Sequence, residues 1–372
     1  MKDKIIPYLA LIPLTALALT PPWAMKLDCT LNSLFWIWMV FESGFLTFLF
    51  LNVKASAWLK LLLVWAYVGC FISKAPYLCF TMYWSVIVCA YYYLLCKQVQ
   101  DFEPVKKVIQ AIFLFIALLI IMQLFGLDTL CNFNQKTPLI LGTIGNKMIL
   151  GTFVCVLAPF LIQVSWLNWI ALLLIAHISD SSGTMLSICA GLGLYLAMTN
   201  KKLRLWVIIA AIAFPCFVAY KTGDFKVFNG PGRYQVWKRT IELTNKKPQG
   251  YGIATYRLIF PLMSRDLEAS RGAGEAKWEY ENTTGKGLAW RRAHNCFTQI
   301  LFEVGWPGFL LFMGFVGTIA WRVRKDALKL SGLAIIGSTM FVHFPTRMTQ
   351  SVLILLMYLA FCEYKEMSHG RS

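Results

Sequence analysis

Long apolar runs separated by short polar loops dominate the chain. A membrane-spanning helix needs roughly 20 mostly apolar residues, or about 17 at the short end, and on this rule the pattern predicts about twelve spans. The runs at 166–178 and 183–199 are short, and only Ser179 to Ser182 separate them. The predicted spans are residues 5–21, 31–53, 57–73, 77–95, 108–126, 148–164, 166–178, 183–199, 204–220, 296–320, 330–344 and 349–364.

One polar segment, residues 221–295, interrupts this pattern and divides the chain into three parts. Residues 1–220 carry the first nine predicted spans, and residues 296–372 carry the last three and a tail. We therefore expect an all-α, polytopic membrane protein with one large insert. Composition agrees, because 58% hydrophobic residues, 14% charged residues and a mean hydropathy of +0.61 are outside the range of soluble domains.

Two regions of the insert have predictable local structure. Residues 233–244 can form a helix that places Arg233, Trp237 and Ile241 on one face at spacings of four. Pro248, Gly250 and Gly252 then predict its end. The charged, glycine-containing stretch 264–292 is typical of a mobile lid.

Basic residues predict the orientation, because short loops rich in Lys and Arg stay in the cytoplasm. With the N-terminus inside, inner loops and termini collect 16 of the 35 basic residues, whereas the short outer loops hold five. Both termini are then cytoplasmic, and the insert faces the other side. The inner set is Lys2, Lys4, Lys54, Lys60, Lys97, Lys106, Lys107, Lys201, Lys202, Arg204, Arg322, Arg324, Lys325, Lys329, Lys365 and Arg371.

Much of the net charge of +17 lies in the insert, which alone carries 14 basic and 7 acidic residues. A basic surface above a bilayer suits phosphates of lipid head groups or of a lipid-linked substrate. The alternative interpretation is a solvated basic loop, and no nucleic-acid-binding pattern is present. The eleven cysteines form no CxxC pair, so metal and redox sites have no support, although Cys29 and Cys131 could pair in the outer loops.

Missing motifs restrict the chemistry. The chain has no Walker-type or dinucleotide glycine loop, no HExxH and no GxSxG, so ATP hydrolysis, zinc proteolysis and the usual serine hydrolysis lack support. It also has no DxD sequence, which counts against a nucleotide-sugar donor. A transferase would then use a lipid diphosphate, whose tail enters from the bilayer while arginines hold its phosphates.

Three stretches resemble the O-antigen ligase and polymerase superfamily of bacterial envelope glycosyltransferases, and a weaker fourth adds to the resemblance. They cover about residues 142 to 320. The stretches are Gly232-Arg233 with Trp237; Pro248-Gln249-Gly250-Tyr251-Gly252; His294-Asn295 with Phe297, Gln299, Leu301, Glu303, Gly305 and Gly308; and, more weakly, Gly142-Thr143-Ile144-Gly145-Asn146.

The resemblance implies glycan transfer on the periplasmic face of the bacterial inner membrane. Undecaprenyl diphosphate would carry the donor glycan, and the acceptor hydroxyl would belong to lipid A core, another glycan or a protein. No cofactor, nucleotide or metal is expected. His294 would be the general base and Arg233 would stabilise the departing diphosphate. Asn295, Trp237 and Gln299 complete the expected substrate contacts.

One departure from the family pattern affects the phosphate contacts. The family commonly has an arginine where this chain has Ser182. Arg291 and Arg292, which lie just before His294, are the nearest substitutes, and Arg257, Arg265 and Arg347 are others. Loss of activity is the alternative interpretation.

Two acidic residues fall inside predicted spans, where an ionisable group suggests function. Glu303 lies nine positions after His294 and nearly on the opposite helix face, which favours an orienting hydrogen bond over catalysis. Glu42 fits packing and a substrate groove equally well.

Several functions remain open at this stage. Ligase, polymerase and protein O-oligosaccharyltransferase would share the donor half of the site. A transporter or flippase of a lipid-linked or anionic solute is a second class, although no matched pair of broken helices is evident. A non-catalytic membrane partner that alters a host glycan enzyme is a third.

The topology is testable with a cysteine introduced at Ser270, in a background in which the native cysteines are controlled. Because the basic residues place the insert outside the cytoplasm, an impermeant thiol reagent should label this cysteine without lysis of the inner membrane. If labelling requires lysis of the inner membrane, both the predicted topology and the assignment of a lipid-diphosphate donor are wrong.

Overall fold

The computed structural model describes residues 55–125, 147–178, 182–206, 209, 233–260, 293, 295–342 and 349–364. These residues form an all-α fold and include no strand. The helices are α3 (Ala57–Ile72), α4 (Pro76–Cys96), α5 (Glu103–Leu124), α6 (Lys147–Val164), α7 (Leu167–Ile178), α8 (Ser182–Thr199), α10 (Arg233–Lys246), α13 (Cys296–Arg322), α14 (Ala327–Val342) and α15 (Thr349–Glu363).

Nine of these helices coincide, to within a few residues, with predicted spans, and they include the two short runs that form α7 and α8. Among the described residues, α4, α5, α8 and α13 are long and apolar enough to cross a membrane, and five further apolar helices are shorter. The total of twelve spans stays a prediction. The predicted spans 5–21 and 31–53, and most of 204–220, lie outside the described residues.

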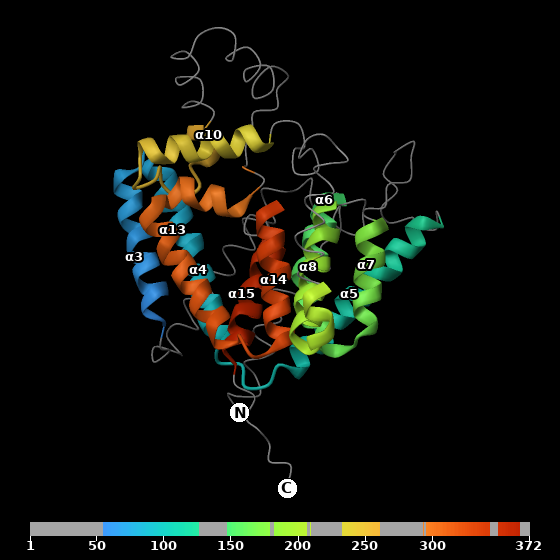
Figure 1. The fold of residues 1–372 in the computed structure, drawn as a ribbon. Helices are drawn as coiled ribbons and strands as arrows, with labels where there is room; N and C mark the ends of the chain where they lie inside the picture. The colour runs from blue at the N-terminus through green and yellow to red at the C-terminus, as the bar shows by residue number, and fades with distance from the viewer. Residues whose placement is uncertain are drawn as a thin grey trace, which may run out of the picture.

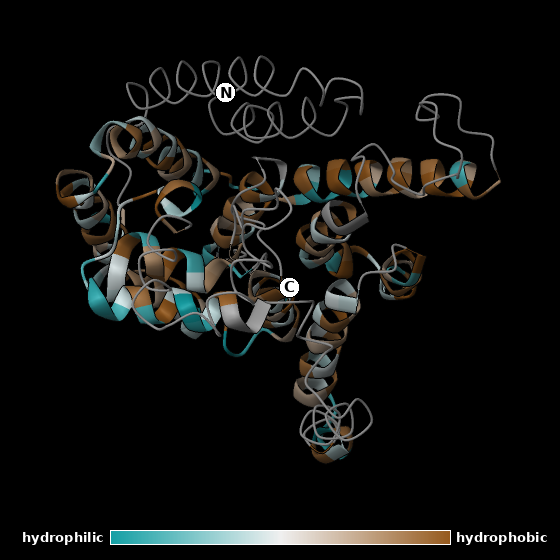
Figure 2. Ribbon diagram, turned by 90° about the horizontal axis from the view of Figure 1, so that it is seen from above, coloured by the Kyte–Doolittle hydropathy of each residue, from teal (hydrophilic) through white to brown (hydrophobic). Residues whose placement is uncertain are grey.

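The apolar helices form a bundle, and α10 lies across one end of it (Figure 1). Within the bundle, α6, α8 and α14 pack together, α3 and α4 pack with each other, and α13 packs on α3. Helix α15 contacts α4, α6 and α13 and so joins the two groups. Figure 2, viewed from the end where α10 lies, shows α10 with mixed hydrophilic and hydrophobic residues beside mostly hydrophobic bundle helices.

The outer surfaces of several bundle helices carry many large apolar side chains. On α3, for example, Leu61, Val64 and Phe71 have exposed fractions of 53%, 60% and 61%. Water would penalise such a surface, but lipid chains would not. This distribution fits the multi-pass membrane protein that the composition predicted.

Helix α13 is broken at Gly305, which has a φ of +69° and a ψ of −177°. The segment before the break, residues 296–304, lies beneath α10, and the segment after it runs down along α3 (Figure 1). Pro307 follows at the start of the second segment, where a missing N–H costs little. We call residues 296–304 the site half-helix.

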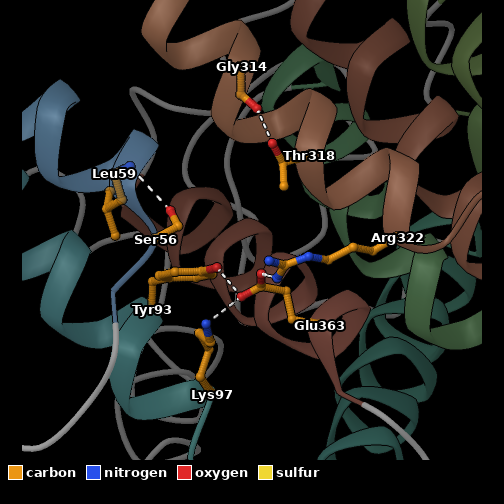
Figure 3. Close-up of polar contacts among 8 residues, drawn as sticks. All are labelled: Ser56, Leu59, Tyr93, Lys97, Gly314, Thr318, Arg322 and Glu363. Atoms are coloured by element: carbon orange, nitrogen blue, oxygen red, sulfur yellow. Dashed lines mark hydrogen bonds and ion pairs between the residues drawn. The ribbon is translucent and has the colours of Figure 1, made fainter.

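A polar cluster around Glu363 holds the bundle together at the end opposite α10. Figure 3 shows its contacts. Its carboxylate accepts a hydrogen bond of 2.5 Å from the Tyr93 hydroxyl, forms an ion pair of 2.7 Å with Lys97, and pairs with Arg322. The carboxylate side chain is 5% exposed, so α4, α13 and α15 are linked through one nearly buried charge.

Three of the residues predicted to face the cytoplasm, all in the described part of the chain, lie at this same end. Lys97 and Arg322 bind Glu363, and Lys329 donates to the backbone oxygen of Tyr364 at 3.0 Å. The alternating direction of the helices therefore agrees with the topology deduced from the basic residues. Which end faces the cytoplasm stays a prediction.

Replacing Glu363 with Gln should destabilise the protein. The change keeps the shape and a partner for Tyr93, but it leaves the Lys97 and Arg322 charges without their anion. Because Arg322 is half exposed, we expect the free energy of unfolding to fall by about 1–3 kcal/mol, less than for a fully buried pair. Chemical denaturation in detergent micelles measures this change.

Glu103→Gln is the matched control, since this glutamate also binds one lysine, Lys106, but its side chain is 62% exposed. Its loss should change stability by less than about 0.5 kcal/mol. Equal effects of the two substitutions would contradict the assigned role of the Glu363 cluster.

Candidate functional site

A second hydrophobic core, separate from that of the bundle, lies between α10 and the site half-helix. Phe302 is its centre: Tyr251 stacks on this ring with centroids 4.4 Å apart, and Tyr256 meets it edge-on at 5.1 Å. Among the described residues, its buried members are Val236, Leu243, Tyr251, Tyr256, Ile259, Phe260, Ala293 and Phe302. Such packing fixes α10 against the site half-helix.

The sequence correctly predicted a helix from Arg233, and it ends at Lys246 before the expected proline and glycines. Its buried side carries Val236, Thr240, Leu243 and Thr244, with i to i+4 and i to i+3 spacing. Thr240 and Thr244 donate their hydroxyls to backbone oxygens one turn back, which satisfies these polar groups within the core.

A tight turn of residues 248–253 fastens the end of α10 to the break in α13. The N–H groups of Tyr251 and Gly252 donate to the carbonyls of Phe302 (3.0 Å) and Glu303 (2.8 Å), and the N–H of Trp306 donates to Pro248 (2.8 Å). A broken helix leaves backbone groups unpaired, and these bonds satisfy them. We call this arrangement the backbone clamp.

Glycine is required on both sides of the backbone clamp. Gly250 and Gly252 have φ values of +87° and +104°, a region that other residues rarely occupy. A Cβ atom on Gly305 would collide with the carbonyl oxygen of Pro248, and one on Gly250 would collide with the backbone of Gly305. The two backbones therefore approach more closely than side chains would permit.

Helix α3 and Ser73, the residue that follows it, hold the clamp from the membrane side. The indole N–H of Trp65 donates to the carbonyl of Val304 at 2.7 Å, which satisfies a third backbone group at the break. The Ser73 hydroxyl donates to the carbonyl of Tyr251 at 2.8 Å. Each contact joins segments more than 170 residues apart in sequence.

At the other end of α10 and the site half-helix, Trp237 connects α10 to the start of α13. Its indole N–H donates to the carbonyl of Ala293 at 2.7 Å, and its ring meets Phe341 of α14 edge-on at 5.4 Å. Ala293 is fully buried and directly precedes His294 in the chain. The indole nitrogen that could have bound a sugar is therefore used to hold the backbone.

Asn295 is the N-cap of α13. Its side-chain oxygen accepts from the N–H groups of Phe297 (2.9 Å) and Thr298 (3.1 Å), and the residue is 2% exposed. A cap of this kind typically stabilises a helix by about 1 kcal/mol. The half-helix also presents its positive N-terminal end here, which favours nearby negative charge.

Gln299 and Glu303 form a buried polar pair on the site half-helix. Gln299 donates Nε2–H to the Glu303 carboxylate at 3.1 Å, as expected of an orienting hydrogen bond, and the two residues are 5% and 4% exposed. The carbonyl oxygen of Gln299 is buried and has no hydrogen-bond partner in the described part of the chain. It is an acceptor that a ligand hydroxyl could use.

Tyr256 and Thr240 share a hydrogen bond of 3.0 Å beside this pair. Burial, the largest effect, raises the pKa of Tyr256 well above its ordinary value, and the Glu303 charge raises it further. The phenol therefore stays protonated at any physiological pH. Its hydroxyl acts as a hydrogen-bonding group and takes no part as a phenolate base.

The remaining predicted site residues are only partly described. Arg233 begins α10, whereas His294, Arg291 and Arg292 lie outside the described residues. Ser182, which replaces the arginine common in the family, begins α8 and is exposed. Among the other arginines considered, Arg257 is exposed, and Arg265 and Arg347 lie outside the described residues, as does the predicted lid 264–292. The proposed Cys29–Cys131 pair and Glu42 also lie outside them.

Sequence reasoning missed the buried Arg239, which is 4% exposed on α10 and lies 3.6 Å from the Glu242 carboxylate. An arginine is almost never this buried without paired charge. The Arg-x-x-Glu spacing of an i to i+3 pair was the available signal, but it is common on solvated helices. Within the described residues, no group of three or more His, Cys, Asp or Glu could hold a metal ion.

These features define an all-α membrane protein whose polar site is built on one broken helix, a crossing helix and the clamp between them. The sequence profile of the O-antigen ligase family matches residues 166–313, from α7 through most of α13. The resemblance to the O-antigen ligase and polymerase superfamily is thereby confirmed.

The matched region contains Arg233, the 248–253 turn and the His294-Asn295 pair, whereas the weaker stretch 142–146 lies outside it. A search of curated proteins gave no match. The family match supports a membrane glycosyltransferase of the cell envelope, connected with lipopolysaccharide biosynthesis.

Trp237→Phe tests the tie between α10 and Ala293. The substitution keeps an aromatic ring against Phe341 but removes the N–H donor, which leaves a buried carbonyl unsatisfied. We expect the free energy of unfolding to fall by about 1–3 kcal/mol, as measured by chemical denaturation. Ile241→Ala, on the exposed side of α10, should change it by less than about 0.5 kcal/mol. A stable Trp237→Phe protein would show that the hydrogen bond contributes little.

Proposed function

We propose that the protein moves a glycan from undecaprenyl diphosphate to an acceptor hydroxyl on the periplasmic face of the inner membrane. The observation that carries this proposal is the fastening of α10 to the site half-helix at both ends, by Trp237 and by the backbone clamp. One helix begins with Arg233, and the other is preceded directly by His294. A rigid frame therefore supports the two residues that the family pattern assigns to catalysis.

The reaction requires one proton transfer and one displacement. The His294 imidazole removes the proton of the acceptor hydroxyl, since it titrates near working pH. The acceptor oxygen then bonds to the anomeric carbon of the donor, while the bond from that carbon to the diphosphate oxygen breaks. Arg233 stabilises the negative charge that develops on the departing diphosphate. No nucleotide, cofactor or metal takes part.

The other predicted contacts have distinct tasks. Arg291 and Arg292 supply the second phosphate contact in place of the arginine missing at position 182. Gln299 offers its buried carbonyl oxygen to a sugar hydroxyl. Asn295 contributes through the capped, positively polarised start of α13, where a diphosphate is favoured. Trp237, whose ring packs against Phe341, offers an aromatic surface on which a sugar ring can stack.

Ligase, polymerase and protein O-oligosaccharyltransferase activities differ in the acceptor, and the frame described above serves the donor half of all three. A ligase uses lipid A core as acceptor, whereas a polymerase extends another glycan. Transport of a lipid-linked solute is a second candidate, supported by the break in α13, because transporters bind substrates at broken helices. Among the described helices, α13 alone has a non-helical residue inside it, so the matched second break is missing there.

His294→Ala should abolish transfer without loss of the protein from the membrane. A lost general base typically costs roughly 10²- to 10⁴-fold in rate, and His294→Gln or Asn should not restore it. The measurement is transfer of labelled glycan from undecaprenyl diphosphate by purified protein in liposomes. Donor binding should be retained, because Arg233 is unchanged.

The accumulated product distinguishes the acceptor classes in cells. A failed ligase leaves lipid A core bare, whereas a failed polymerase leaves it with one repeat unit. Wild-type transfer by His294→Ala would remove the base assignment. Transport across the liposome membrane without any transfer would favour the second candidate.

A further inference from the structure

A basic corner lies where the end of α10 meets the end of α3. Lys247 follows α10 directly, and its ammonium group donates a hydrogen bond of 2.8 Å to the carbonyl of Ile72, the last residue of α3. The last carbonyls of a helix have no partner within the helix and carry partial negative charge, so a lysine is stabilised there. Lys247 is thus held in a fixed place at the end of the bundle.

A second lysine shares this corner. Lys74 lies two residues after Ile72, in the short connection between α3 and α4, and is exposed. Burial and, to a smaller degree, the Lys74 charge lower the pKa of Lys247 from its ordinary value. Lys246, also exposed, immediately precedes Lys247. Positive charges are therefore concentrated at one point, although like charges repel.

The Lys247 ammonium group still has capacity to bind an anion. It has three N–H donors, one of which bonds to the carbonyl of Ile72. Its nitrogen also lies 5.3 Å from the centroid of the Tyr251 ring. No ion pair in the described part of the chain involves Lys247. An anion placed between Lys74 and Lys247 would reduce their repulsion and use these donors.

The surface beside the corner is apolar and aromatic. Phe71 and Tyr77 have exposed fractions of 61% and 88%, and Ile72 has 37%. Aromatic residues of this kind are enriched where a membrane meets water, the level at which lipid phosphates lie. The corner therefore combines ammonium groups with an adjacent surface suited to lipid chains. Figure 1 shows the ends of α3 and α4 that form it, beneath α10.

We propose that Lys74 and Lys247 bind the phosphate of a lipid at this corner. The site lies at the opposite end of α10 from Arg233, and a helix of that length spans about 20 Å at 1.5 Å per residue. One diphosphate cannot reach both ends. An anionic phospholipid head group of the surrounding leaflet is the occupant that this separation favours, and the proposal goes beyond glycan transfer.

The experiment measures lipid binding to the purified full-length protein, independently of transfer. Phosphatidylglycerol, zwitterionic phosphatidylcholine and undecaprenyl diphosphate are titrated separately into detergent micelles, and the shift of the melting temperature is recorded. Phosphatidylglycerol should stabilise the wild-type protein, and phosphatidylcholine should do so much less. Lys74→Gln should weaken phosphatidylglycerol binding by about ten- to a hundredfold, because one charge-assisted contact is lost.

Lys202→Gln is the matched control, because it removes the same charge from an exposed lysine just after α8, at the other end of the bundle, and should bind like wild type. Lys247→Gln should weaken binding as much as Lys74→Gln, and Lys247→Arg should retain it. If Lys247→Gln does not fold, the affinity of Lys74→Gln for phosphatidylglycerol alone tests the proposal.

The two lipid sources give different results. If Lys74→Gln loses binding of phosphatidylglycerol alone, the site binds a phospholipid. If it loses binding of undecaprenyl diphosphate alone, the same site binds the donor lipid. Unchanged affinity of Lys74→Gln for both lipids would overturn the proposal. A failure of glycan transfer with intact lipid binding would concern the proposed function only.

Discussion

The break at Gly305 is the constraint on which the rest of the structure depends. A helix that stops inside a membrane protein exposes backbone groups that lipid cannot satisfy. Here the carbonyls of Phe302 and Glu303 accept from the 248–253 turn, and that of Val304 accepts from Trp65. Each freed group is paired with a segment distant in sequence, so the break creates the junction between the insert and the bundle.

The two ends of the protein are joined by different physical means. At the α10 end the junction consists mainly of neutral backbone hydrogen bonds and stacked rings, which respond little to salt and demand close geometry, with one charged donor, Lys247. At the opposite end it consists of charges around Glu363, which tolerate small displacements but weaken when ions screen them. Precise positioning is thus concentrated where the candidate site lies.

Local pattern was enough to predict the helices, because each apolar run or capped segment specifies its own structure. The bounds of α3 and α4 follow from their apolar lengths, and the end of α10 follows from Pro248 and the glycines. The contacts of the site could not be deduced in this way. Trp237 donates to Ala293, 56 residues away, so its spacing on α10 said nothing of that bond. The glycines at 250 and 252 indicated a turn, but not the carbonyls with which it pairs.

The backbone clamp also bears on the order in which the protein is built. It joins the 248–253 turn, in the middle of the chain, to the 302–306 region near the end, and Trp65 and Ser73, nearer the beginning, support it. A ribosome releases these segments in that order, and contacts between distant segments form only after the last has emerged. The early helices can enter the bilayer and pack while the site is still absent. The candidate site is therefore assembled only when α13 is in place, and a partly synthesised chain that lacks α13 does not contain it.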